Sequence, residues 1–175
     1  MSEKRRAVFL DRDGTLMEEV NYCGDPALVK LFPGVPQALA KLKAAGFLTI
    51  VVTNQSGIGR GYFTEADYRA VQNELLRQIG GGSIDASYFC ADVPGEPSQR
   101  RKPETGMVLE AAADFDIDLS GSFFIGDKIA DIECGRRSGT RTILVLTGYG
   151  AGENCTPDFV AKDFVEAVEI VLEHA

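Results

Sequence analysis

A short apolar run that ends abruptly in acidic residues decides the fold: Ala7-Val8-Phe9-Leu10-Asp11-Arg12-Asp13-Gly14-Thr15. Four uninterrupted apolar residues are typical of a strand that is buried on both faces, as in a parallel sheet. The Asp-Gly pair favours a turn, so we expect this strand to end at Leu10. Outward from it, similar runs predict strands over residues 48–53, 84–90, 122–125 and 142–146, with a short sixth strand at Phe159–Ala161.

Amphipathic stretches separate these runs and predict helices over residues 36–45, 64–79, 107–115, 129–137 and 163–173. Thr64 begins the longest helix with an approximate capping box. Strands that alternate with helices indicate a doubly wound, Rossmann-like α/β fold with a parallel sheet. No linker or repeat interrupts the alternation, so we expect a single domain over residues 1–175. Only the irregular stretches 11–35 and 91–105 are long, which leaves no room for a separate cap domain.

The residue inventory excludes several kinds of site. His174 is the single histidine, so one chain cannot build a Ser-His-Asp triad, a Cys-His pair or a multi-histidine metal site. The four cysteines stand far apart without a Cys-x-x-Cys pair, which fits neither a zinc ribbon nor a dense disulfide framework. The chemistry must therefore rest on carboxylates, hydroxyls, Lys and Arg.

The net charge of the chain and its N-terminal segment indicate which partners the protein binds and where in the cell it is found. The chain has 26 Asp+Glu against 18 Lys+Arg, a net charge of −8, whereas general nucleic-acid binding needs a basic face. The basic residues 1–6 precede only four apolar residues, too few for a signal peptide or a membrane span. We therefore expect a cytoplasmic, monomeric protein that binds neither nucleic acid nor membranes.

Polar residues follow the predicted strands at their carboxyl ends, which share one edge of a parallel sheet. Asp11 and Asp13 follow the first strand, Thr53 ends the second, and Asp127 follows the fourth. These three carboxylates cannot all stay ionised close together without a cation, and oxygen ligands suit Mg²⁺. With Lys102 from the loop before residue 107 and the Thr53 hydroxyl, this edge can receive a phosphate dianion.

Each motif by itself also has an ordinary structural explanation. Asp13-Gly14 is a common turn pair, and Asp127 can simply cap the helix that follows it. The basic residues 100–102 can be a solvated surface run. Their combination along one edge favours a functional site.

Taken together, the motifs resemble those of the haloacid dehalogenase-like phosphatases: Asp-x-Asp-Gly-Thr at residues 11–15, Thr53, Lys102, and Gly-Asp-x-x-x-Asp at residues 126–131. A closer similarity, from Ala7 to about Gly150, points to the branch of histidinol phosphatases and heptose-bisphosphate phosphatases. It rests on Phe32-Pro33-Gly34-Val35, Thr53-Asn54-Gln55-Ser56-Gly57-Ile58, Arg60-Gly61-Tyr62-Phe63-Thr64 and Arg101-Lys102-Pro103. The second and third segments are similar to those of heptose 1,7-bisphosphate 7-phosphatases, because histidinol phosphatases usually carry Asp after the Gln.

The resemblance implies a mechanism and a set of site residues. Asp11 would attack phosphorus and form an aspartyl-phosphate, and Asp13 would serve as general acid and then as general base. Mg²⁺ would be held by Asp11, Asp127 and the backbone carbonyl of Asp13, while Thr53 and Lys102 hold the phosphate oxygens. Asp131 would orient Lys128 or a metal-bound water. The substrate would contact Arg12, Glu19, Val20, Asn21, Tyr22, Asn54, Gln55, Ser56, Arg101 and Lys128.

The sequence departs from the family in one loop. Many heptose phosphatases hold a structural zinc with Cys-x-His and then Cys-x-Cys, where this chain has Cys90-Ala91-Asp92 and Ser98-Gln99-Arg100. Because one cysteine cannot close a tetrahedral zinc site, we expect no zinc.

The resemblance implies hydrolysis of the 7-phosphate of D-glycero-D-manno-heptose 1,7-bisphosphate, in the synthesis of lipopolysaccharide or another heptose product. One alternative is a phosphatase for histidinol phosphate or another sugar phosphate. An alternative of another class is a non-catalytic phospho-acceptor or binding domain, such as a receiver domain. Asp13 distinguishes the two classes, because a phospho-acceptor needs no second aspartate two residues after the first.

Overall fold

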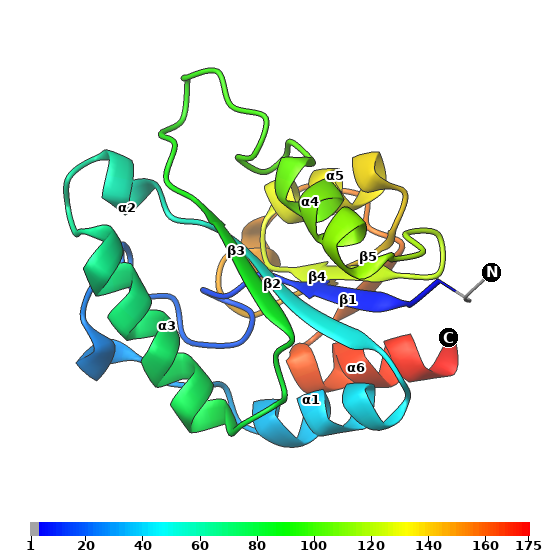
Figure 1. The fold of residues 1–175 in the computed structure, drawn as a ribbon. Helices are drawn as coiled ribbons and strands as arrows, with labels where there is room; N and C mark the ends of the chain where they lie inside the picture. The colour runs from blue at the N-terminus through cyan, green and yellow to red at the C-terminus, as the bar shows by residue number, and fades with distance from the viewer. Residues whose placement is uncertain (1–3) are drawn as a thin grey trace.

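The computed structural model describes residues 4–175, and the first three residues of the basic N-terminal segment lie outside this range. Within it, a six-stranded sheet has the order β3-β2-β1-β4-β5-β6, and all its strand pairs are parallel (Figure 1). The strands are β1 Ala7–Leu10, β2 Leu48–Asn54, β3 Ala86–Cys90, β4 Phe123–Gly126, β5 Arg141–Val145 and β6 Phe159–Ala161. The predicted doubly wound α/β fold is confirmed, and each strand begins and ends within about two residues of its predicted bounds.

The helices are α1 Val35–Ala44, α2 Ser56–Gly59, α3 Glu65–Ile79, α4 Gly106–Phe115, α5 Ile129–Ser138 and α6 Phe164–Glu173, with 3-10 turns at Pro26–Leu28 and Gly150–Gly152. The helix α2 and both 3-10 turns were not predicted, because they are too short to show a hydrophobic period. At α3 the predicted capping box is present, since Thr64 and Asp67 each accept the other's backbone N–H. No helix in residues 4–175 combines the length and apolar character that a membrane span requires.

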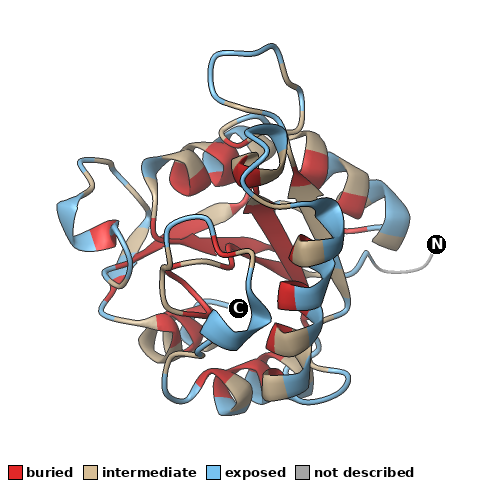
Figure 2. Ribbon diagram, turned by 90° about the vertical axis from the view of Figure 1, so that its left-hand side faces the viewer, coloured by how far each residue is buried: buried red, intermediate tan, exposed pale blue. Residues whose placement is uncertain are grey.

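Helices cover both faces of the sheet, which explains why its central strands are continuously apolar. Val8 and Leu10 of β1 belong to a core cluster that includes side chains of α1, α3 and α6. Ala7 and Phe9 belong to a second cluster with side chains of α4 and α5 on the opposite face (Figure 1). Buried residues accordingly lie along the strands and on the inward sides of the helices, while the outer loops are exposed (Figure 2).

The sheet order places the carboxyl ends of three strands side by side. β1 pairs with β2 on one side and with β4 on the other, all in parallel. The residue after β1 is still tied to this ladder, because the backbone N–H of Asp11 donates to the carbonyl of Ile125 at 3.0 Å. Side chains that follow these strands are therefore held at one edge by the most buried part of the fold.

We expect the loss of stability on shortening a helix side chain to depend on how deeply that side chain is buried. Leu39 on α1 is fully buried, whereas Leu109 on α4 is 51% exposed. Leu39→Ala should lower the free energy of unfolding by about 2–5 kcal/mol, and Leu109→Ala should change it by no more than about 0.5 kcal/mol. Urea unfolding followed by circular dichroism measures both, and equal losses would contradict the packing of α1 described above.

Candidate active site

Lys102 lies at the centre of the site, although it comes from the loop before α4. Its ammonium donates to the Oδ1 atoms of Asp11 at 2.8 Å and Asp131 at 2.6 Å, and to the carbonyl of Val52 at 2.8 Å. These bonds use all three of its hydrogens. Burial by itself lowers the pKa of Lys102, but the charges of Asp11 and Asp131 outweigh this effect and raise the pKa above 10.5. Lys102 is therefore a permanently charged part of the interior.

The backbone of Lys102 is held as firmly as its side chain. Its N–H donates to Oδ1 of Asn54 at 3.0 Å, and Nδ2 of Asn54 donates back to its carbonyl at 3.1 Å. Asn54 is the last residue of β2, so this pair of bonds docks the loop before α4 against the edge of the sheet. Asn54 was predicted to bind substrate, and the structure gives its amide this structural contact as well.

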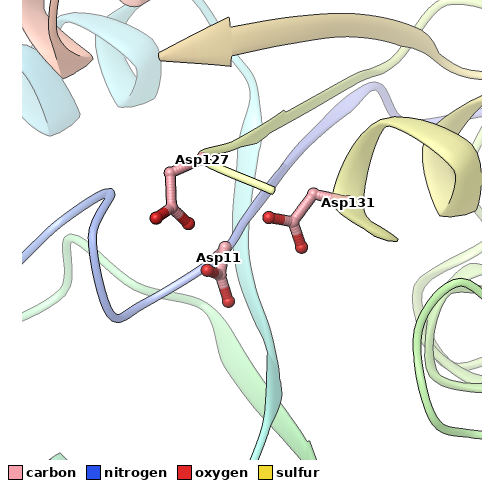
Figure 3. A group of neighbouring side chains, drawn as sticks. All are labelled: Asp11, Asp127 and Asp131. Carbon is pink, nitrogen blue, oxygen red and sulfur yellow. The ribbon is translucent and has the colours of Figure 1, made fainter. Parts of the chain in front are cut away.

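Three buried aspartates surround a common point next to Lys102. Oxygen atoms of Asp11, Asp127 and Asp131 all lie within 4.8 Å of one another, and their carboxylates point toward each other (Figure 3). Burial, followed by the charges of Asp11 and Asp131, raises the pKa of Asp127 to about 9. Burial and the charge of Asp11 raise the pKa of Asp131 to about 6. Burial also raises the pKa of Asp11, but Lys102 and Lys128 outweigh it, so the pKa ends below 3.8 and Asp11 is ionised.

These aspartates suit a divalent cation. Oδ2 of Asp127 accepts the backbone N–H of Tyr149 at 2.9 Å, whereas its Oδ1 is buried and finds no hydrogen-bond partner in residues 4–175. A buried oxygen without a donor is unfavourable, and a hard cation satisfies it. Asp11 and Asp127, the two side chains predicted to hold the metal, both belong to this cluster. The third carboxylate of the cluster belongs to Asp131 rather than to Asp13.

Asp131 is bound more tightly into the site than expected. Besides its contact with Lys102, its Oδ2 accepts the backbone N–H of Lys128 at 3.1 Å. The expected link between Asp131 and Lys128 therefore exists, but it runs through the backbone. The Lys128 side chain instead approaches Glu19, with 3.6 Å between Nζ and Oε2, and lies over the ring of Tyr149.

Glycines let the backbone approach the buried carboxylates. A Cβ atom at Gly14 would lie 2.2 Å from Oδ2 of Asp127, and one at Gly126 would lie 2.3 Å from Oδ2 of Asp131. Gly14 also has a φ of +84°, which L-residues rarely adopt. The Asp-x-Asp-Gly motif thus needs its glycine both for the turn and for the space that Asp127 occupies.

Asp13 is held from two sides by side-chain donors. Arg12 donates to its two carboxylate oxygens at 3.0 and 3.1 Å. Gln55 donates to Oδ2 of Asp13 at 2.9 Å and to the Thr53 hydroxyl at 2.8 Å. Because Gln55 is the donor to Thr53, the threonine keeps its own hydrogen for another acceptor.

A cavity of about 420 Å³ opens at this edge of the sheet. The predicted residues that line it are Asp11, Asp13, Glu19, Asn21, Tyr22, Thr53, Asn54, Gln55, Ser56, Arg101, Lys102 and Lys128. Asp127 is fully buried outside this lining, next to Asp11 and Asp131.

Two residues that were expected to contact the substrate lie outside the cavity lining. Arg12 is fully buried and does not line the cavity, because its side chain turns into the interior toward Asp13 and lies over the ring of Tyr68. Val20 does not line the cavity either, because it packs against the hydrophobic core. Arg12 therefore acts on the site through Asp13.

Several residues that line the cavity were not predicted from the sequence. Arg60 lies in the Arg-Gly-Tyr-Phe-Thr segment that was used only for the family resemblance, so that motif could have identified it. Tyr149 and Glu153 follow β5, whose carboxyl end lies at the same edge as those of β1 and β4. These two residues could therefore have been predicted, because the carboxyl ends of parallel strands share one edge of the sheet. Pro94 follows β3, whose carboxyl end also lies at this edge, so the same reasoning could have found it.

The loop after β3 corresponds to the one in which many heptose phosphatases were said above to hold zinc. Its single cysteine, Cys90, donates from Sγ to Oδ2 of Asp92 at 3.3 Å. Burial raises the pKa of this thiol, which keeps it protonated. The absence of zinc stays a prediction.

Comparisons with known proteins agree with this geometry. The “HAD-hyrolase-like” family model matches residues 99–167. The D-glycero-D-manno-heptose-1,7-bisphosphate 7-phosphatase of Thermosynechococcus vestitus is 39% identical to the chain, over 97% of the chain and 97% of its own length. The enzyme of the same name from Chlorobaculum tepidum is also 39% identical, over 95% of the chain and 94% of its own length. The crystal structure of D,D-heptose 1.7-bisphosphate phosphatase from B. bronchiseptica, complexed with magnesium and phosphate, has a TM-score of 0.90 at 31% identity and covers 97% of this chain and 99% of its own. This chain is therefore a phosphatase and belongs to the haloacid dehalogenase-like family, in the branch that contains the heptose-bisphosphate phosphatases.

Proposed function

We propose that this phosphatase hydrolyses the 7-phosphate of D-glycero-D-manno-heptose 1,7-bisphosphate, with Mg²⁺ as cofactor and an aspartyl-phosphate on Asp11 as intermediate. The observation that carries the proposal is the placement of Asp11: an ionised carboxylate, paired with Lys102 and flanked by two further aspartates, that lines a polar cavity. The sugar is proposed from the names of the relatives.

Asp11 is suited to be the nucleophile. Lys102 holds Oδ1 of Asp11, which leaves the other carboxylate oxygen to attack phosphorus. A bond from this oxygen to phosphorus forms while the bond from phosphorus to the sugar oxygen breaks. Water then attacks the aspartyl-phosphate, which releases phosphate and restores the carboxylate of Asp11.

Asp13 is suited to move the protons of both steps. It would give a proton to the departing sugar oxygen and then take one from the attacking water. The donors on Arg12 and Gln55 would fix its position for both proton transfers.

The remaining groups would hold the transferring phosphoryl group. The Thr53 hydroxyl, which keeps its own hydrogen, would donate to its oxygens. The Lys102 ammonium, whose hydrogens are taken by Asp11, Asp131 and Val52, would attract these oxygens through its charge. Mg²⁺ would be held by Asp11, Asp127 and the backbone carbonyl of Asp13, and when bound it neutralises phosphate charge. Asp131 would hold Lys102 in place from the opposite side.

The cations of the cavity favour a substrate with two phosphates. Arg60 and Arg101 line the cavity in addition to Lys102, whereas Lys128 is partly neutralised by Glu19. Two arginines suit a second phosphate, since guanidinium groups bind phosphate oxygens in pairs. They disfavour histidinol phosphate, whose amino group is itself a cation.

The substrate assignment predicts a clear preference in a kinetic panel. Each charge-assisted hydrogen bond to a second phosphate contributes about 1.5–3 kcal/mol, so kcat/KM for the heptose 1,7-bisphosphate should exceed that for histidinol phosphate by about 100-fold or more. Phosphate release measured on the bisphosphate, histidinol phosphate and hexose monophosphates checks this. Equal kcat/KM values across the panel would reject the heptose assignment.

The proposed roles of Asp11 and Asp13 predict different degrees of loss. Asp11→Asn should lower kcat by about 10⁴-fold or more because it removes the nucleophile, and Asp13→Asn should lower it by about 10²–10⁴-fold. Asp25→Asn is the matched control, because Asp25 is exposed and asparagine caps the turn that follows it equally well. If Asp11→Asn retained a tenth of the wild-type rate, Asp11 would not be the nucleophile.

The space around Asp127 allows a test of the metal site. Gly14→Ala and Gly46→Ala should each lose about 1–2 kcal/mol of stability to backbone strain, because both residues have a φ above +80°, and Gly14→Ala should lose more because of its contact with Asp127. Only the new Cβ at Gly14 meets Asp127, since a Cβ at Gly46 has nothing within 4 Å in residues 4–175. Saturating Mg²⁺ should raise the Tm of the wild type and of Gly46→Ala by about 5–10 °C and that of Gly14→Ala by much less. If Mg²⁺ raised the Tm of Gly14→Ala as much as that of the wild type, the metal would bind at a site other than the one around Asp127.

A further inference from the structure

Three consecutive basic residues before α4 point to three different places. Arg100 pairs with the carboxylate of Glu110 on α4 and donates to the carbonyl of Phe89 at 2.9 Å. Lys102 is buried among the aspartates of the site. Arg101 lies between them in the chain and lines the cavity. Arginine side chains have many rotamers, so something must hold Arg101 there.

Ser98 holds the backbone of Arg101. Its Oγ accepts the N–H of Arg101 at 2.9 Å and that of Arg100 at 3.2 Å. The same hydroxyl donates to Oδ2 of Asp92 at 2.5 Å. One serine thus joins the turn that carries Arg101 to the residue that lies two positions after β3.

Asp92 holds the side chain of Arg101. Its backbone carbonyl accepts from Nη1 of Arg101 at 3.0 Å. The position of Asp92 is in turn fixed by Ser98 and by the thiol of Cys90, which is the last residue of β3. The hydrogen bonds from Ser98 and Cys90 lower the pKa of Asp92, as expected for a carboxylate that only accepts. The chain of contacts therefore runs from the sheet through Asp92 to the guanidinium.

We propose that Asp92 and Ser98 are positioning residues that hold Arg101 in the cavity for the part of the substrate remote from the reacting phosphorus. This proposal rests on the proposed function. Asp92 and Ser98 are absent from the cavity lining, so they act only through Arg101. Lys102 is held separately by Asn54, Asp11 and Asp131, so the loss of Ser98 should affect substrate binding rather than chemistry.

The test compares two substrates in Ser98→Ala. For the heptose 1,7-bisphosphate we expect KM to rise about 10-fold with kcat within about twofold, because two backbone contacts and the link to Asp92 are lost. For p-nitrophenyl phosphate, which has one phosphate and no sugar, we expect unchanged kinetics. Ser98→Thr keeps the hydroxyl and should restore the wild-type KM.

A matched control and a double-mutant cycle separate positioning from general stability. Ser120 makes the same kind of bond, from its hydroxyl to Asp118 at 2.7 Å, and neither residue lines the cavity, so Ser120→Ala should leave KM unchanged. In an Arg101→Ala background, Ser98→Ala should have no further effect on KM. The proposal is overturned if Ser98→Ala leaves the KM for the heptose bisphosphate unchanged, or if it raises the KM equally for both substrates. It is also overturned if Ser98→Ala raises KM as much in the Arg101→Ala background as in the wild type.

Failure of the proposed function has a different signature. It would appear in the wild type as a lack of preference for the heptose bisphosphate in the kinetic panel. The Ser98→Ala, Ser98→Thr and Arg101→Ala comparisons are then made on the best substrate of that panel, where the same outcomes support or overturn the positioning role.

Discussion

The ion pairs of Lys102 with Asp11 and Asp131 are the interaction on which the rest of the site depends. A buried ammonium is unfavourable unless its charge and all its hydrogens are matched, and here two carboxylates and the Val52 carbonyl match them. The three partners come from the residue after β1, from β2 and from α5, while Lys102 comes from the loop before α4. The site therefore forms only when these segments are docked together, so its geometry is as rigid as the core beneath it.

The same arrangement makes the ionisation of Asp127 unfavourable and raises its pKa to about 9. Three buried carboxylates face one buried ammonium, and the orphaned oxygen of Asp127 shows where a cation is needed. A chain with a net charge of −8 can still receive a phosphate, because the groups around the cavity include Arg60, Arg101 and Lys102. The local field at the site, rather than the overall charge, governs substrate binding.

The parts of the site that could be predicted are those fixed by backbone topology. Asp11, Thr53 and Asp127 were placed correctly at one edge because parallel strands end on the same side. The inward direction of the Arg12 side chain could not be predicted, because neighbouring residues in a turn point in different directions and only the packing around Tyr68 decides which of them faces inward. Asp131 was expected to orient Lys128 or a metal-bound water, and its close approach to Asp11 and Asp127 depends on how closely α5 approaches β4 at Gly126.

By itself, the sequence determined the doubly wound α/β fold, the family, and the edge of the sheet at which the chemistry lies. These features follow from hydrophobic periodicity, strand ends and short motifs, which are local along the chain. Only the tertiary structure decided which charges are paired, buried or free. Arg100, Arg101 and Lys102 are consecutive cations, yet one pairs with a helix, one lines the cavity and one is buried. The physical reason is that a side chain's role depends on partners distant in sequence, and only folding brings these partners together.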